Sequence, residues 1–169
     1  MILRVDPAAA MLHVGKRSIP CSIGRSGVVA TADKREGDGA TPIGRWPLRC
    51  VLLRADRIAP PRPLALPWRW LRPEDGWSDD PADPAYNRPV RHPHGFSAER
   101  LWRDDGLYDV IVTLGHNDRP PRPGAGSAIF LHCRREGAAT EGCVAIAREA
   151  LVALLPQLSP EDRIEIGAG

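Results

Sequence analysis

A histidine and a cysteine that could carry out acyl transfer lie close together late in the chain, at His132 and Cys143. An imidazole can accept a thiol proton and the thiolate can attack a carbonyl carbon, so this pair is the minimum for nucleophilic catalysis. The alternative for any free cysteine is a buried, inert thiol. Cys133 fits that alternative, because it follows His132 directly and successive side chains of a strand point to opposite faces. If His132 faces a cleft, Cys133 faces the core, and Cys143 is the better nucleophile.

The turn before Cys143 and the helix expected after it indicate how the thiol could be activated. We expect the thiol near the N-terminus of that helix, where unpaired N–H groups and the local field lower a thiol's pKa. Gly142 has no side chain, so the backbone can approach a substrate closely there. The N–H groups near Gly142 and Cys143 could then form an oxyanion hole.

The cysteines do not predict a metal centre. The chain has four of them, without CxxC spacing: Cys21, Cys50, Cys133 and Cys143. A zinc site that combined the last two with His116 and His132 is conceivable, but its spacing matches none of the common zinc patterns. We therefore predict no metal, and the chain is longer than the small domains that depend on disulfide frameworks.

Apolar patterning predicts one domain, residues 1–169, with a mainly β (α+β) fold. Expected strands cover residues 2–5, 11–14, 17–23, 45–54, 109–114, 128–132 and 162–166. A helix is predicted over 147–155 and ended by Pro156. The arrangement expected is a mixed, mostly antiparallel β-sandwich or barrel-like domain with one or two helices. His132 would then project from the end of a buried strand, and the glycine-rich, charged stretch 24–44 would be a loop.

Residues 60–93 have an unusual composition. This segment holds nine prolines and four large aromatic residues, Trp68, Trp70, Trp77 and Tyr86. Proline removes backbone donors, so a long helix or a central strand is not expected, and the tryptophans are untypical of a flexible linker. We expect an ordered Pro/Trp-rich loop that caps the domain and acts as a lid. The alternative is a loop whose tryptophans only complete a small core.

Composition and charge exclude several classes of function. The chain is 43% apolar and 26% charged, as in globular proteins, and its formal net charge of +2 does not favour nucleic-acid binding. No apolar run reaches the length of a transmembrane helix, and no secretory signal is visible at the N-terminus. We expect a monomer without a membrane span.

Several motifs together resemble one enzyme family. His132 followed by Thr140-Glu141-Gly142-Cys143 is similar to the signature of the YkuD-type L,D-transpeptidase domain: a histidine, a short loop, then Ser/Thr-x-Gly-Cys. Residues 34–44, which end in Gly-Ala-Thr-Pro-Ile-Gly, resemble that family's Thr-Pro-x-Gly turn. Residues 115–118 (Gly-His-Asn-Asp) and 86–88 (Tyr-Asn-Arg) resemble segments of one proteobacterial branch.

The resemblance implies a function and roles for the motif residues. It implies a β-rich fold with a cysteine cleft, and peptidoglycan stem peptides or muropeptides as partners. A stem-peptide bond would be cleaved, the acyl group held as a thioester on Cys143, and then passed to an amine of a neighbouring stem, supplied by diaminopimelate. His132 would act as base and the Thr140 hydroxyl would order the loop. No metal or organic cofactor is implied.

The sequence departs from the family pattern around the cysteine. Many members have His before Gly-Cys and Arg two residues after the cysteine, where this chain has Glu141 and Ala145. The loop from the histidine to the cysteine is also shorter than in the better-known members. Another cation must then recognise substrate carboxylates. The substrate-binding residues we predict are Arg88, Arg134, Tyr86, Asn87 and His116.

Two other functions stay open at this point. An L,D-carboxypeptidase on the same scaffold would resolve the thioester with water and would suit cytoplasmic recycling of wall fragments. A wall-binding module would keep Cys143 and His132 as inactive relics. The transpeptidase would act in the periplasm or cell envelope if exported, and the absence of a visible signal is the observation that favours the cytoplasmic alternative.

Overall fold

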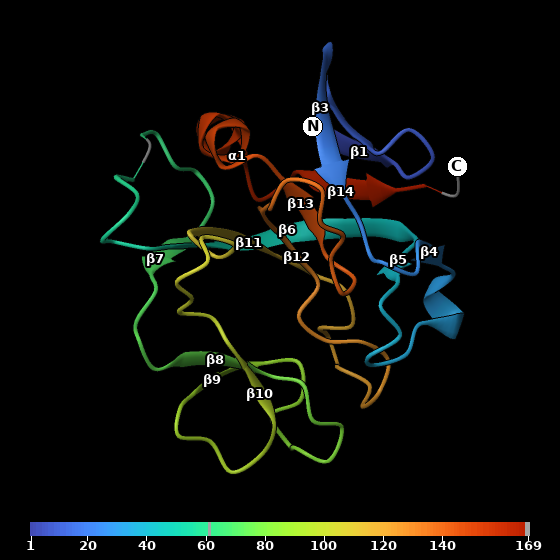
Figure 1. Cartoon of the computed structure of the whole chain (residues 1–169), viewed down its shortest axis with the longest axis vertical. Coiled ribbons are helices and arrows are strands. Elements are labelled where there is room, and N and C mark those ends of the chain that lie inside the picture. The colour runs from blue at the N-terminus through green and yellow to red at the C-terminus, as the bar shows by residue number, and fades with distance from the viewer. Residues whose placement is uncertain (61, 168–169) are drawn as a thin grey trace.

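Alternate apolar side chains produce the strands that the sequence predicts, and the strands form a closed, barrel-like sheet (Figure 1). The computed structural model describes residues 1–60 and 62–167. In their order around the sheet the strands are β11 (Val110–Leu114), β12 (Phe130–Cys133), β13 (Val144–Ile146), β3 (Arg17–Ser22), β2 (Met11–Val14), β1 (Ile2–Asp6), β14 (Arg163–Ile166) and β6 (Gly44–Leu53). The sheet closes because β6 pairs with β14 along its first half and with β11 along its second half.

Most of these neighbours are antiparallel, as predicted, but β1–β14 and β12–β13 are parallel. The β2–β3 connection is a tight turn at Gly15, whose φ of +59° is readily adopted by glycine. The predicted helix is present as α1 (Arg148–Leu154) and continues into a 3₁₀ turn, η2 (Leu155–Gln157). Among the described residues, no helix is long and apolar enough to cross a membrane.

The two faces of β11 contact different apolar clusters. Val110 and Val112 belong to the main core, where Leu151 and Leu154 of α1 also pack. Ile111 points the opposite way, into a smaller cluster outside the barrel. That second cluster consists of Leu52, Leu71, Leu101, Tyr108, Ile111, Phe130 and Cys143. The candidate nucleophile therefore lies on the outer side of the sheet wall, away from the main core.

The Pro/Trp-rich segment is ordered, as predicted, but it is not a continuous loop. Three short strands fall within it: β7 (Trp68–Trp70), β8 (Asp75–Ser78) and β9 (Pro89–Arg91). β7 pairs with β6 alone, whereas β8 lies between β9 and β10 (Ala98–Arg100) in a separate small sheet. Proline is compatible with these strands because they are short and lie mostly at sheet edges, as Pro89 does at the start of β9. Residue 61 lies outside the described residues.

The glycine-rich stretch 24–44 is also mostly irregular but contains three short elements. These are β4 (Val28–Val29), the 3₁₀ turn η1 (Thr31–Asp33) and β5 (Thr41–Pro42). β4 and β5 pair in parallel with each other. The chain here runs close to the turn before Cys143, because the Thr140 N–H donates to the Ile23 carbonyl and the Arg25 N–H donates to the Thr140 carbonyl.

Candidate active site

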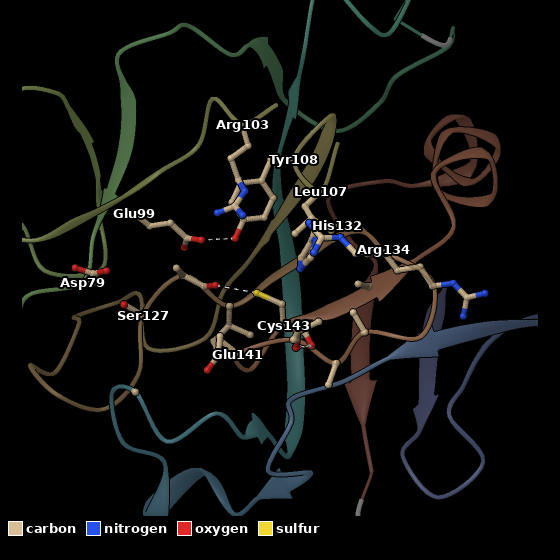
Figure 2. Close-up of a pocket in the computed structure, with 18 of the residues that line it drawn as sticks. Asp79, Glu99, Arg103, Leu107, Tyr108, Ser127, His132, Arg134, Glu141 and Cys143 are labelled. Atoms are coloured by element: carbon tan, nitrogen blue, oxygen red, sulfur yellow. Dashed lines mark hydrogen bonds between the residues drawn. The ribbon is translucent and has the colours of Figure 1, made fainter. Parts of the chain in front are cut away.

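His132 and Cys143 come from neighbouring parallel segments and face the same way. The register of β12 and β13 places His132 opposite Ala145. Because side chains two residues apart share a face, Cys143 lies on the same side as Ala145 and His132. Both line a cavity of about 450 Å³ (Figure 2). Cys133 packs in the main core on the other face, which confirms the predicted alternation.

The prediction that the Cys143 thiol lies at a helix N-terminus is wrong. The apolar residues 144–146 continue as β13 between β12 and β3, so a strand separates the cysteine from α1. The thiol instead donates to the Ala128 carbonyl at 3.1 Å and accepts from the Phe130 N–H at 3.3 Å. Burial, with a contribution from the Glu99 charge, raises the pKa of Cys143 to about 12. The cysteine is therefore a neutral thiol near neutral pH.

The His132 ring is held with one defined nitrogen free to act as a base. Nδ1 lies 2.8 Å from the Cys133 carbonyl, which can only accept, so Nδ1 carries the proton and Nε2 is the basic atom. The Tyr108 ring packs edge-on against the imidazole at 5.1 Å. Burial lowers the pKa of His132 to about 4, so the ring is neutral. Within the described residues the thiol and the imidazole are not hydrogen-bonded to each other.

Thr140 organises the turn that leads to the cysteine. Its hydroxyl donates to the Cys143 carbonyl at 2.7 Å and accepts from the Gly142 N–H at 3.1 Å. That bond occupies the Gly142 N–H, so of the two predicted oxyanion donors the Cys143 N–H is the better candidate. Gly142 has φ +139°, and a Cβ there would lie 2.9 Å from the Ala40 carbonyl oxygen, so the position requires glycine.

Of the five predicted substrate-binding residues, Arg134 lines the cavity and the other four do not. Arg88 donates to the Asp118 carbonyl at 2.5 Å and lies beside a separate pocket. The buried Tyr86 donates to the Glu36 carboxylate. Their roles in binding stay predictions. Of the five, only Arg134 lines the cavity with Cys143 and His132, and in the view of Figure 2 its guanidinium points away from Cys143.

Asn87 and His116 instead support the cavity wall from behind. The Asn87 amide donates to the carbonyls of His116 and Asn117, and its Oδ1 accepts from the Ala128 N–H at 3.1 Å. The Ala128 carbonyl accepts the hydrogen bond from the Cys143 thiol. By holding the Ala128 N–H, Asn87 therefore positions the residue to which the candidate nucleophile is bonded. His116 lies edge-on against Trp46 at 4.8 Å, and its Nε2 contacts the Ala125 carbonyl at 3.1 Å.

Outside the motif at residues 140–143, eight polar or charged residues of the cavity were not predicted: Lys34, Glu36, Asp79, Glu99, Arg103, Tyr108, Ser127 and Arg135. They come from segments far apart in the chain and form no motif. Only Lys34 and Glu36 could have been suspected from the sequence, because they lie in the charged stretch that resembles the family's upstream turn. Among the described residues, no group of three or more His, Cys, Asp or Glu side chains is arranged to hold a metal ion.

Comparison with known proteins relates this geometry to one family. The sequence model described as the L,D-transpeptidase catalytic domain (YkuD) matches residues 2–166. L,D-transpeptidase 1 of Mycobacterium tuberculosis is a solved structure that is 14% identical, with a TM-score of 0.45 over 99% of this chain and 58% of that chain. An L,D-transpeptidase from Mycobacterium smegmatis is 15% identical, with the same score and coverage. The chain thus spans 58% of the length of these two structures, and no curated protein matches it.

Proposed function

The chain belongs to the family of YkuD L,D-transpeptidase catalytic domains, and from that premise we propose that it cross-links peptidoglycan stem peptides through a thioester on Cys143. One observation carries this proposal: Cys143 and His132 line the same cavity from neighbouring segments, with the His132 Nε2 left unprotonated. Stem peptides or muropeptides are the proposed partners. The cell envelope is the proposed place of action.

The first half of the reaction forms the acyl-enzyme. Because the thiol and the imidazole are both neutral, the proton moves to His132 Nε2 as the substrate binds and the sulfur attacks. The thiol must first leave the Ala128 carbonyl, its partner in the free protein. The S–C bond forms, the peptide C–N bond breaks, and His132 gives its proton to the leaving amine. The Cys143 N–H stabilises the oxyanion.

The second half decides between the two catalytic alternatives. An amine that attacks the thioester gives a cross-link, whereas water gives the product of an L,D-carboxypeptidase. The third alternative, a wall-binding module with a relic cysteine, forms no acyl-enzyme. A single assay separates all three: purified muropeptides are incubated with the protein, the products are read by mass spectrometry, and the protein's intact mass is followed for an adduct.

Matched cysteine variants test the nucleophile. Cys143→Ala should abolish product and adduct while the melting temperature stays close to that of the wild type. Cys133→Ala should remain active with a stability loss of about 1 kcal/mol, since it leaves only a small core cavity. A fully active Cys143→Ala protein would refute the proposed mechanism.

Matched histidine variants test the base. His132→Gln should lower kcat by about 10²–10⁴-fold with little change in KM, the usual range for general-base assistance. His116→Gln is the control, because His116 does not line the cavity. A larger kcat loss in His116→Gln than in His132→Gln would mean that the base is assigned to the wrong histidine.

A further inference from the structure

The cavity has two chemically different sides. In Figure 2, Asp79, Glu99 and Ser127 lie on one side of Cys143, and His132 and Arg134 lie on the other. The two carboxylates reach the cavity from the small sheet: Glu99 is a residue of β10 and Asp79 follows β8 directly. Arg103 lies beside Glu99 and Tyr108 in Figure 2, so this side of the cavity carries a cation as well as two carboxylates.

Glu99 is held in place with one oxygen still available. The Tyr108 hydroxyl donates a hydrogen bond to Glu99 Oε1 at 2.5 Å. None of the described residues forms a hydrogen bond with Oε2. Burial raises the pKa of Glu99, with further contributions from the charges of Asp79 and Glu36, while Arg103 and the Tyr108 bond act in the opposite direction. A raised pKa makes the Glu99 carboxylate a stronger base than an exposed glutamate.

Two polar atoms of the residues that line this side of the cavity have no hydrogen-bond partner among the described residues. Ser127 is only 7% exposed and lines the cavity, yet its hydroxyl has no hydrogen-bond partner among the described residues. The same is true of Asp79 Oδ1, which is buried. A buried acceptor without a donor is costly. A primary ammonium group carries three donors, the number needed to satisfy one oxygen each of Asp79, Glu99 and Ser127.

We propose that Glu99, together with Asp79 and Ser127, binds the primary ammonium group of the acyl acceptor and removes one of its protons. This inference rests on the proposed function, because the acceptor must meet a thioester on Cys143. Glu99 takes one proton from the ammonium group, and the freed lone pair attacks the thioester carbonyl. A C–N bond forms, His132 accepts the second amine proton, the C–S bond breaks, and the departing thiolate recovers that proton. Glu99 then releases its proton to solvent.

The Glu99→Gln variant tests this assignment in the full-length protein with muropeptide substrates. It keeps the side-chain shape and removes the charge. The acyl-enzyme should still form. The ratio of cross-linked to hydrolysed product should fall by about tenfold to a hundredfold, which corresponds to the free energy that a hydrogen bond to a charged group usually contributes. Glu149→Gln is the matched control, because Glu149 lies on α1, outside the cavity. It should keep the wild-type ratio.

A second acceptor distinguishes ammonium binding from general damage. Hydroxylamine is uncharged near neutral pH, so Glu99→Gln should keep its reaction with hydroxylamine while losing reaction with ammonium acceptors. An unchanged product ratio in a Glu99→Gln protein that still forms acyl-enzyme would overturn the inference. If Glu99→Gln does not fold, Asp79→Asn provides the same readout and the same two outcomes. If the wild type itself forms no acyl-enzyme, the proposed function fails first, and this inference falls with it.

Discussion

The hydroxyl of Thr140 donates a hydrogen bond to the main-chain carbonyl of Cys143 at 2.7 Å, and it accepts one from the Gly142 N–H at 3.1 Å. One side chain thus fixes the backbone on both sides of the bond between Gly142 and the nucleophile. The turn depends on it more than on any contact of Glu141, whose exposed side chain pairs with Arg25 at the surface.

Thr140→Val should destabilise the fold and misplace the cysteine. It keeps the shape of threonine but loses both hydrogen bonds, at about 1–3 kcal/mol of unfolding free energy. Thr140→Ser keeps the hydroxyl and should restore most of the loss. Urea unfolding and the rate of acyl-enzyme formation measure the two effects. Equal stability and rate in Thr140→Val and the wild type would mean that the turn is ordered by other contacts.

His132 should make the protein sensitive to acid. Its pKa is lowered from 6.5 to about 4 by burial, so the folded state favours the neutral ring. The contribution of the neutral His132 ring to the free energy of unfolding is fully present above pH 6.5 and is lost as the pH falls through about 4. The loss amounts to about 3 kcal/mol over that range. Urea unfolding across this range should show a shallower pH dependence in His132→Gln; identical dependence in both proteins would contradict the assignment.

Arg134 and Arg88 should differ in their effect on substrate binding. Arg134 lines the cavity with Cys143, whereas Arg88 is bonded to the Asp118 carbonyl beside another pocket. Arg134→Ala should raise KM for peptides with a free carboxylate by roughly tenfold. Arg88→Ala should leave KM unchanged and cost about 1 kcal/mol of stability. Steady-state kinetics on both variants decide the matter, and a KM effect confined to Arg88→Ala would reverse the assignment.

Trp77 and Trp68 should differ in their effect on stability. Trp77 packs edge-on against Phe130 at 5.1 Å, and its Nε1 donates to Asn87 at 2.9 Å. Trp77→Ala should therefore cost about 3–5 kcal/mol. Trp68 is 38% exposed, and Trp68→Ala should cost about 0.5 kcal/mol or less. Thermal unfolding of the two variants compares them. Equal losses would contradict the separate roles of the two tryptophans.

The positions of the tryptophans in residues 60–93 also concern the prediction that this segment is a lid. None of Trp68, Trp70 and Trp77 lines the cavity, and Asp79 is the one residue of the described part of segment 60–93 that does. The small sheet borders the cavity through two residues, Asp79 directly after β8 and Glu99 of β10. A gating role for the segment stays a prediction, and the tryptophans themselves are placed for packing or for the surface.

The sequence alone was enough to predict seven of the strands, the helix and the candidate pair His132 and Cys143. Those features depend on local rules: alternation and apolar runs define strands, and a strand's alternation separates His132 from Cys133. The motif Thr140-Glu141-Gly142-Cys143 lies within one turn, so its spacing could be read directly. The error about the helix N-terminus arose because residues 144–146 are a short apolar run, which fits a buried strand or a helix start equally well.

Only the tertiary structure decided what surrounds the pair. Glu99 and Asp79 line the same cavity as Cys143 because the small sheet lies beside the outer face of the barrel, a long-range arrangement that no local pattern encodes. The protonation state of the Cys143 thiol depends on the same arrangement. The pKa of a thiol depends on burial and on charges from distant segments, so the neutral state of Cys143 became visible only when the cavity around it was in place.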